Sequence, residues 1–126
     1  MRGVIIIADS IKSAREGFKR GTVEMIILSL LDENDEKYGY QLAQMIQEIS
    51  NDILVIPEGS MYPTLYRLEE FGFIAGEKRL CGKRRQRTYY RMLPKGKERL
   101  AKLIHEYKLV QNGINLILEH TADEEA

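Results

Sequence analysis

The sequence predicts a mainly α-helical fold with a small β-hairpin and a long C-terminal helix. Apolar residues recur at helical spacing between residues 22 and 70, and the pattern changes to a period of two between residues 73 and 92. A nearly continuous apolar stripe then runs from residue 100 to residue 118. The 126 residues therefore suffice for one compact domain with an appendage.

Residues 1–20 form an N-terminal extension whose structure stays open. Residues 5–7 favour a strand or a packed extension, whereas residues 10–20 are typical of a short amphipathic helix. Residues 1–16 would either add a contact between subunits or remain flexible. The apolar run at residues 4–8 is too short to cross a bilayer and lacks a signal-peptide pattern, so we expect a cytoplasmic protein.

Two amphipathic helices open the domain that we assign to residues 21–93. Thr22 is a suitable N-cap for the first helix. Its apolar stripe consists of Val23, Ile26, Ile27, Leu30 and Leu31. After a polar connection at residues 32–37, the stripe of the second helix consists of Tyr38, Leu42, Met45, Ile46 and Ile49. Both stripes must be buried.

A third helix follows Pro57-Glu58-Gly59, whose proline and glycine interrupt the preceding segment. Ser60 is its predicted cap, and Pro63 then falls in the first turn, where a missing N–H is tolerated. Gly72 is a natural C-terminal stop. The inward face carries Met61, Leu65 and Leu68, the opposite face carries Pro63, Tyr66 and Arg67, and Tyr62 lies on the flank.

The hairpin after Gly72 is strongly basic. Thr88, Tyr90 and Met92 alternate with polar neighbours, and Gly82 lies near the turn. Residues 78–91 contain seven lysines and arginines and no acidic residue, although the whole chain has a formal net charge of zero. Helices followed by a basic hairpin give the order of a winged helix-turn-helix, whose positive strip would suit duplex DNA.

The segment from Pro94 predicts a long helix, and we assign residues 94–126 to a dimerisation helix with an acidic, frayed tail. Its apolar stripe is too long for a small core to cover, so a second copy of the chain is the expected cover. The stripe consists of Leu100, Leu103, Ile104, Tyr107, Val110, Ile114, Ile117 and Leu118.

These residues closely resemble the PadR family of transcriptional regulators over roughly residues 18–100. The matching stretches are GTVEMIIL at 21–28, YGYQL at 38–42, GSMYPTLYRLE at 59–69, GFI at 72–74, the basic pair at 84–85 leading to YYR at 89–91, and PKG at 94–96. Leu93 departs from the family pattern, which usually has a threonine there, so the start of the last helix is less firmly specified.

The resemblance implies a homodimeric winged-helix repressor of transcription. Its third helix would enter the major groove, its wing would touch the adjacent backbone or minor groove, and its last helix would form the dimer. Family members often control genes for phenolic-acid detoxification or multidrug export, and some bind an aromatic or drug-like effector. A cavity for an effector and a fully packed dimer interface both stay open here.

The candidate DNA-binding residues lie on the helices and the hairpin. They are Tyr40, Ser60, Tyr62, Pro63, Tyr66, Arg67, Lys83, Arg84, Arg85 and Arg87. The competing interpretation is structural: the tyrosines would complete the core, Arg67 would pair with Glu70, and the basic run would be a solvated surface.

Other functions find less support in the sequence. No nucleophile-and-base set or phosphate-cradling loop is visible, and His105 and His120 lack partners at metal-ligand spacing, so we expect no enzyme, metal or cofactor. Cys81 lies among cations and is either incidental or redox-sensitive. The alternative function is a protein-interaction module with a winged-helix fold and no specific DNA target.

Overall fold

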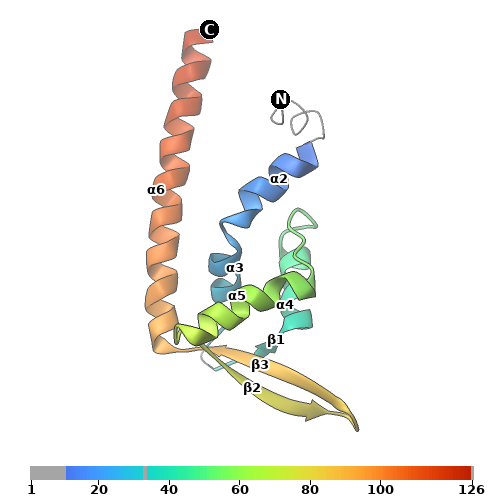
Figure 1. The fold of residues 1–126 in the computed structure, drawn as a ribbon. Helices are drawn as coiled ribbons and strands as arrows, with labels where there is room; N and C mark the ends of the chain where they lie inside the picture. The colour runs from blue at the N-terminus through green and yellow to red at the C-terminus, as the bar shows by residue number, and fades with distance from the viewer. Residues whose placement is uncertain (1–10, 33, 126) are drawn as a thin grey trace.

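The computed structural model describes residues 11–32 and 34–125, and its mainly α-helical architecture confirms the predicted fold class. Figure 1 shows a cluster of short helices, a protruding hairpin and one long helix. In chain order the elements are α2 (Ile11–Arg20), α3 (Val23–Leu30), β1 (Lys37–Tyr38), α4 (Gly39–Ile49), α5 (Glu58–Glu70), β2 (Ile74–Cys81), β3 (Arg85–Met92) and α6 (Pro94–Glu125). The strand or extension predicted at residues 5–7 lies outside the described residues.

The first two predicted stripes form α3 and α4, with two corrections. Thr22 does stand at the N-cap of α3, but its hydroxyl donates to the carbonyl of Lys19 at 2.7 Å and makes no capping bond. Ile49 was expected in the core and is 64% exposed. It is the last residue of α4, one turn beyond Ile46, which the core does bury.

Helix α5 begins earlier than predicted. Pro57 occupies the N-cap and Glu58 is the first helical residue, so Ser60 lies inside the first turn and does not cap it. Pro63 is consequently the sixth residue of the helix, where its missing N–H removes a bond to the carbonyl of Gly59. Pro57 has the extended conformation usual at an N-cap (φ −58°, ψ 144°), and its ring holds φ near this value.

The end of α5 is where the sequence predicted it. Gly72 adopts a φ of +77°, which is accessible to glycine without strain. Its N–H donates to the carbonyl of Glu69 at 3.0 Å, and the N–H of Phe73 donates to the carbonyl of Leu68 at 2.9 Å. These paired bonds are the Schellman arrangement that ends a helix and redirects the chain. They lead directly into strand β2.

The hairpin belongs to a three-stranded antiparallel sheet of order β1-β3-β2. Strands β2 and β3 pair from Ile74 opposite Met92 to Cys81 opposite Arg85. Strand β1 was missed in the sequence because it contains only Lys37 and Tyr38, which pair with Tyr90 and Tyr89. The outer part of the hairpin therefore extends beyond the third strand.

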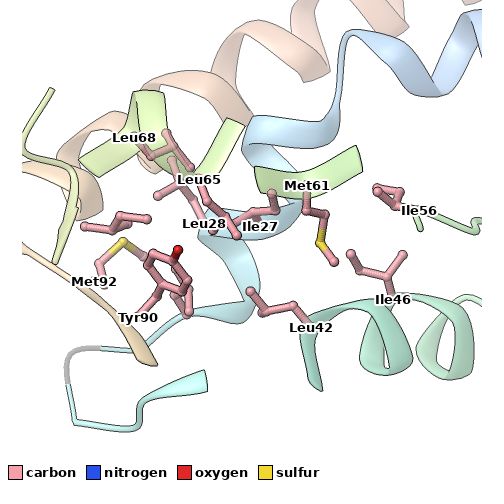
Figure 2. Packing of buried hydrophobic residues seen from close by; sticks show 12 residues of the cluster. Ile27, Leu28, Leu42, Ile46, Ile56, Met61, Leu65, Leu68, Tyr90 and Met92 are labelled. Atoms are coloured by element: carbon pink, nitrogen blue, oxygen red, sulfur yellow. The ribbon is translucent and has the colours of Figure 1, made fainter. Parts of the chain in front are cut away.

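The core lies between α3, α4, α5 and the base of the sheet (Figure 2). The predicted inward residues of α5, Met61, Leu65 and Leu68, are each at most 2% exposed. Tyr90 and Met92 cover the core from β3, as the alternation in the sequence indicated. Figure 2 shows their side chains directed toward Leu65 and Leu28, so the wing is anchored at its base by apolar packing.

Helix α6 begins at Pro94, where the N–H groups of Gly96 and Lys97 donate to the carbonyl of Leu93. Leu93 therefore caps the helix through its backbone, without the hydroxyl that threonine would supply. The helix continues to Glu125, whereas the sequence had suggested a frayed tail after residue 120. Figure 1 shows its C-terminal half standing apart from the other helices. Among the described residues, no helix combines the length and apolar character that crossing a membrane requires.

Candidate nucleic-acid interface

Helix α5 presents a polar face to solvent because its opposite face is committed to the core. Tyr66 is 59% exposed, and Ser60, Pro63 and Arg67 are also exposed. Arg67 makes one long hydrogen bond, from Nη2 to Oγ1 of Thr64 at 3.4 Å. The ion pair with Glu70 that the structural interpretation required does not occur among the described side chains. Arg67 therefore keeps most of its donors available.

Tyr62 is half-buried and is held by neighbours on its own helix. Its hydroxyl donates to Oε1 of Glu58 at 2.6 Å, and its ring stacks on Tyr66 with 6.0 Å between centroids. The hydrogen bond to Glu58, followed by burial, raises the pKa of Tyr62 to about 12. Gly39 at the start of α4 permits this placement, since a Cβ there would lie 3.0 Å from the Tyr62 hydroxyl.

A groove of about 450 Å³ separates α5 from the outer hairpin. It brings together predicted residues from distant parts of the chain: Tyr40, Tyr62, Tyr66, Arg85 and Arg87. The Tyr40 hydroxyl, half exposed, accepts a hydrogen bond from Nε2 of Gln44 at 3.1 Å. Aromatic faces and guanidinium groups on one concave surface are suited to contact with nucleic-acid bases and phosphates.

Ser60 and Arg67 line the other flank of α5. They contribute to an open groove of about 560 Å³ whose second wall is formed by residues 16–24 of α2 and α3. Lys19 ties that wall to the α4–α5 connection by donating to the carbonyl of Val55 at 2.7 Å. The predicted residues thus divide between both flanks of α5, with Tyr62 and Tyr66 in the groove beside the hairpin and Ser60 and Arg67 in the other groove.

The tip of the hairpin is a free cationic surface. Lys83 and Arg84 form the turn after Gly82, whose φ is +77°, and Arg85 begins β3. All three cations are exposed, and in the described part of the chain none of them forms an ion pair. Among the described residues, no acidic side chain therefore neutralises the positive charge at this tip.

Other cations of the hairpin have partners inside the molecule. Nη2 of Arg79 lies 2.7 Å from Glu36 and 2.8 Å from Glu77. The hydrogen bonds that Arg79 donates to Glu77 and Glu36 raise the pKa of its guanidinium. Arg87, predicted to bind DNA, has its guanidinium 4.3 Å from the centre of the Tyr38 ring. The uniform positive strip read in the sequence is thus divided into free and engaged cations.

Sequence reasoning missed Glu58 and Glu36. The i, i+4 spacing of Glu58 and Tyr62 was a usable signal once both were placed on one helix. Glu36 had no such signal, because its partner Arg79 lies 43 residues away along the chain.

The apolar stripe of α6 divides into a covered and an uncovered part. Leu100 and Leu103 pack against the core of their own chain, and Ile104 is half-buried. Beyond them the predicted residues are exposed, from 43% to 67%: Tyr107, Val110, Ile114, Ile117 and Leu118. Leu109 and Leu116, which were not singled out in the sequence, are exposed as well.

The described residues contain no group of three or more histidine, cysteine or acidic side chains that could hold a metal ion. Cys81 is half-buried, with its Sγ 3.3 Å from the Tyr89 hydroxyl. His120 approaches Glu124 at 3.2 Å on the exposed end of α6.

Comparison with known proteins gives consistent results. The family model described as "Transcriptional regulator PadR-like family" matches residues 27–102. A transcriptional regulator of Mycobacterium tuberculosis is 36% identical over 83 residues, covering 66% of this chain and 73% of that protein. The crystal structure of a PadR family transcriptional regulator from Eggerthella lenta superposes with a TM-score of 0.78 at 29% identity, covering 89% of this chain and 95% of the other.

A more distant likeness concerns the crystal structure of Bacillus subtilis PadR in complex with operator DNA. The TM-score is 0.60 and the identity 24%, and the match covers 66% of this chain and 47% of that one. At this identity the likeness shows a common fold.

Proposed function

Because the chain belongs to the PadR-like family of transcriptional regulators, we propose that it binds specific double-stranded DNA as a cytoplasmic homodimer and represses transcription. The observation that carries the proposal is the exposure of Tyr66 and Arg67 on α5, together with a wing tip whose cations form no ion pair among the described residues. Bacillus subtilis PadR, which shares the fold, has been crystallised with operator DNA.

The proposal is tested by an electrophoretic mobility shift on the DNA upstream of the gene, with scrambled DNA of equal length as competitor. A shift that the specific DNA alone competes away supports specific binding. The absence of any shift would instead favour a protein-interaction module.

In this proposal α5 lies in the major groove. Arg67 can donate two parallel bonds to guanine, and the Tyr66 ring can contact thymine methyl groups. Arg67→Ala should weaken specific binding by about 1–3 kcal/mol and relax the preference at one base pair. Glu70→Gln, an exposed change on the same helix, is the matched control and should not weaken binding. Equal affinities of Arg67→Ala and the parent protein would remove the base-reading role.

The wing tip is proposed to contact phosphates. Each neutralised phosphate releases counterions, so the logarithm of affinity falls with the logarithm of salt concentration. Lys83→Ala or Arg84→Ala should reduce this salt slope by about 1 while weakening specific and non-specific DNA alike. A slope identical to that of the parent protein would show that the tip does not touch the backbone.

The uncovered stripe of α6 is proposed to pair with its counterpart in a second copy. Exposed isoleucine and leucine side chains at helical spacing favour association with another apolar helix. The two copies of α5 would then address half-sites about one helical turn apart. Ile117→Glu should shift the protein to monomers in sedimentation velocity, whereas Asn112→Glu, off the stripe, should not. A parent protein that sediments as a monomer at micromolar concentration would refute this arrangement.

Release of the DNA by a small aromatic or drug-like effector is proposed as the regulatory step. Within one chain the recess between α3, α5 and α6 holds only about 150 Å³, below the roughly 300–1,000 Å³ of usual ligand pockets. An effector bound in this recess beside α6 would therefore need additional space between two protomers, where it could change the separation of the recognition helices. Titration of phenolic and drug-like compounds into the protein–DNA complex tests this, and a complex insensitive to all of them would count against it.

A further inference from the structure

We infer that Arg79 is a positioning residue, which sets the angle of the wing by binding Glu36 and does not contact DNA phosphates. The inference deepens the proposed function and rests on it for its meaning in DNA binding. It removes Arg79 from the hairpin cations that contact DNA, and it makes Glu36, an acidic residue, necessary for full DNA binding.

The ion pair of Glu36 and Arg79 joins the outer hairpin to the helical part of the domain, where the sheet provides few backbone hydrogen bonds between them. Strand β1 pairs with β3 only at Tyr89 and Tyr90, near the base of the hairpin. Arg79 lies opposite Arg87, in the first stretch of hairpin without a third strand. A two-stranded ribbon is marginally stable by itself. Glu36 lies just before β1 and reaches Arg79 with two contacts, at 2.7 and 2.9 Å.

Aromatic stacking reinforces the connection. The Arg79 guanidinium lies 4.9 Å from the centre of the Tyr89 ring, which meets Tyr38 edge-on at 5.4 Å. Arg87 covers the other ring at 4.3 Å. The stack therefore runs Arg79, Tyr89, Tyr38, Arg87, and its third member belongs to β1 and leads into α4. Each cation gains a ring face as well as its polar contacts.

The local charge balance argues against a role of Arg79 in phosphate binding. Two carboxylates, from Glu36 and Glu77, share its guanidinium, so the group of three carries a net charge of −1. Both carboxylates contact Nη2 of Arg79, so a phosphate that approached this guanidinium would meet two negative charges at the same group. Lys78 on the same strand is exposed and, within the described residues, forms no ion pair.

The geometry makes the wing tip sensitive to this connection. Three residue steps lead from Arg79 to Gly82, a lever of about 10 Å at roughly 3.3 Å per residue. A rotation of about 20° at Arg79 would displace the tip by roughly 3.5 Å, enough to break a direct hydrogen bond of 2.7–3.2 Å. The cations at the tip would then no longer face the DNA phosphates, even though their own charge is unchanged.

The test compares two variants with the same change of charge. Glu36→Gln and Glu77→Gln each remove one carboxylate beside Arg79, but only Glu36 connects the hairpin to the body. Long-range electrostatics would make both bind DNA more tightly. The inference predicts that Glu36→Gln binds about threefold to fivefold more weakly, as the loss of a partly exposed ion pair allows, and that Glu77→Gln does not. Equal or tighter binding by Glu36→Gln would overturn it.

A charge exchange separates positioning from contact. The double variant Glu36→Arg with Arg79→Glu keeps the net charge and lets Arg at position 36 pair with the carboxylates at positions 77 and 79. Most of the affinity lost in Arg79→Glu alone should return in the double variant. A phosphate contact would not be restored, because a carboxylate would then face the DNA, so persistent weak binding would refute the inference.

Hydrogen exchange on the full-length protein without DNA gives an independent measurement. Glu36→Gln should accelerate amide exchange in residues 78–88, and Glu77→Gln should not, while both variants keep the parent circular dichroism spectrum. Unchanged amide exchange in Glu36→Gln would refute the positioning role of the Glu36–Arg79 pair, whether or not the protein binds DNA. A parent protein that failed to bind DNA would refute the proposed function and leave this measurement valid.

Discussion

The contact between the start of α6 and the connection from α5 to β2 gives a sharp prediction for Gly96→Ala. A Cβ at Gly96 would clash with the carbonyl oxygen of Phe73 and lie 3.1 Å from Sδ of Met92. Phe73 cannot retreat easily, because its N–H closes the end of α5 and its carbonyl accepts the N–H of Leu93 at 3.0 Å. Helix α6 would have to move outward by more than about 1 Å to reach ordinary contact distance.

Opposing effects decide how much the free energy of unfolding falls in Gly96→Ala. Overpacking of this kind costs typically about 1–3 kcal/mol, and a lost hydrogen bond from Leu93 adds about 1 kcal/mol. Alanine recovers about 1 kcal/mol because it favours the helix over glycine. We therefore expect Gly96→Ala to lower the free energy of unfolding by about 2 kcal/mol and the melting temperature by roughly 5–15 °C.

Gly17→Ala in α2 is the matched control, since nothing lies within 4 Å of its added Cβ. The same substitution should there stabilise the protein by roughly 0.5–1 kcal/mol. Differential scanning calorimetry of both variants at equal protein concentration measures the difference. If Gly96→Ala melts at or above the temperature of Gly17→Ala, the close approach of α6 to Phe73 is absent and the reasoning fails.

Further predictions concern the core, the α5 tyrosine and the base of α6. Leu65→Ala should destabilise the fold by about 2–5 kcal/mol in urea unfolding because Leu65 is fully buried; a loss below about 1 kcal/mol would contradict that. The raised pKa of Tyr62, about 12, means that the stabilisation from its protonated hydroxyl is complete below about pH 10 and lost as pH rises toward 12. Glu58→Gln should move the Tyr62 titration, followed by NMR of labelled tyrosine, back toward 10, and an unmoved titration would reject the hydrogen bond as the cause. Arg99→Ala should cost less than about 1 kcal/mol, since its 2.7 Å pair with Glu24 is partly exposed, and a larger loss would show a role beyond that pair.

Local patterns predicted the elements well where one periodicity extended over several turns. The stripe of Met61, Leu65 and Leu68 and the stop at Gly72 were found because each depends on neighbours in the chain. The predicted start of α5 and the predicted burial of Ile49 were wrong, since helix ends depend on which residues the adjoining elements cover. Strand β1 escaped detection because two residues carry no periodic signal.

The candidate site shows the same division. Tyr66 and Arg67 on α5 and the cations at the hairpin tip were recognisable from the sequence, and their roles in binding DNA remain proposals. The engagement of Arg79 was not recognisable, since every basic residue of the hairpin looks alike in one dimension.

The order of amino acids by itself determined the main helices and the hairpin, which of their faces are apolar, and where positive charge accumulates. Those properties arise from spacing within a segment, so no other part of the chain is needed to specify them. Tertiary structure alone decided which cations stay free and which part of the α6 stripe remains uncovered. Glu36 reaches Arg79 and the core covers Leu103 only after distant segments meet, and charge and apolar surface are neutralised or buried only through such contacts.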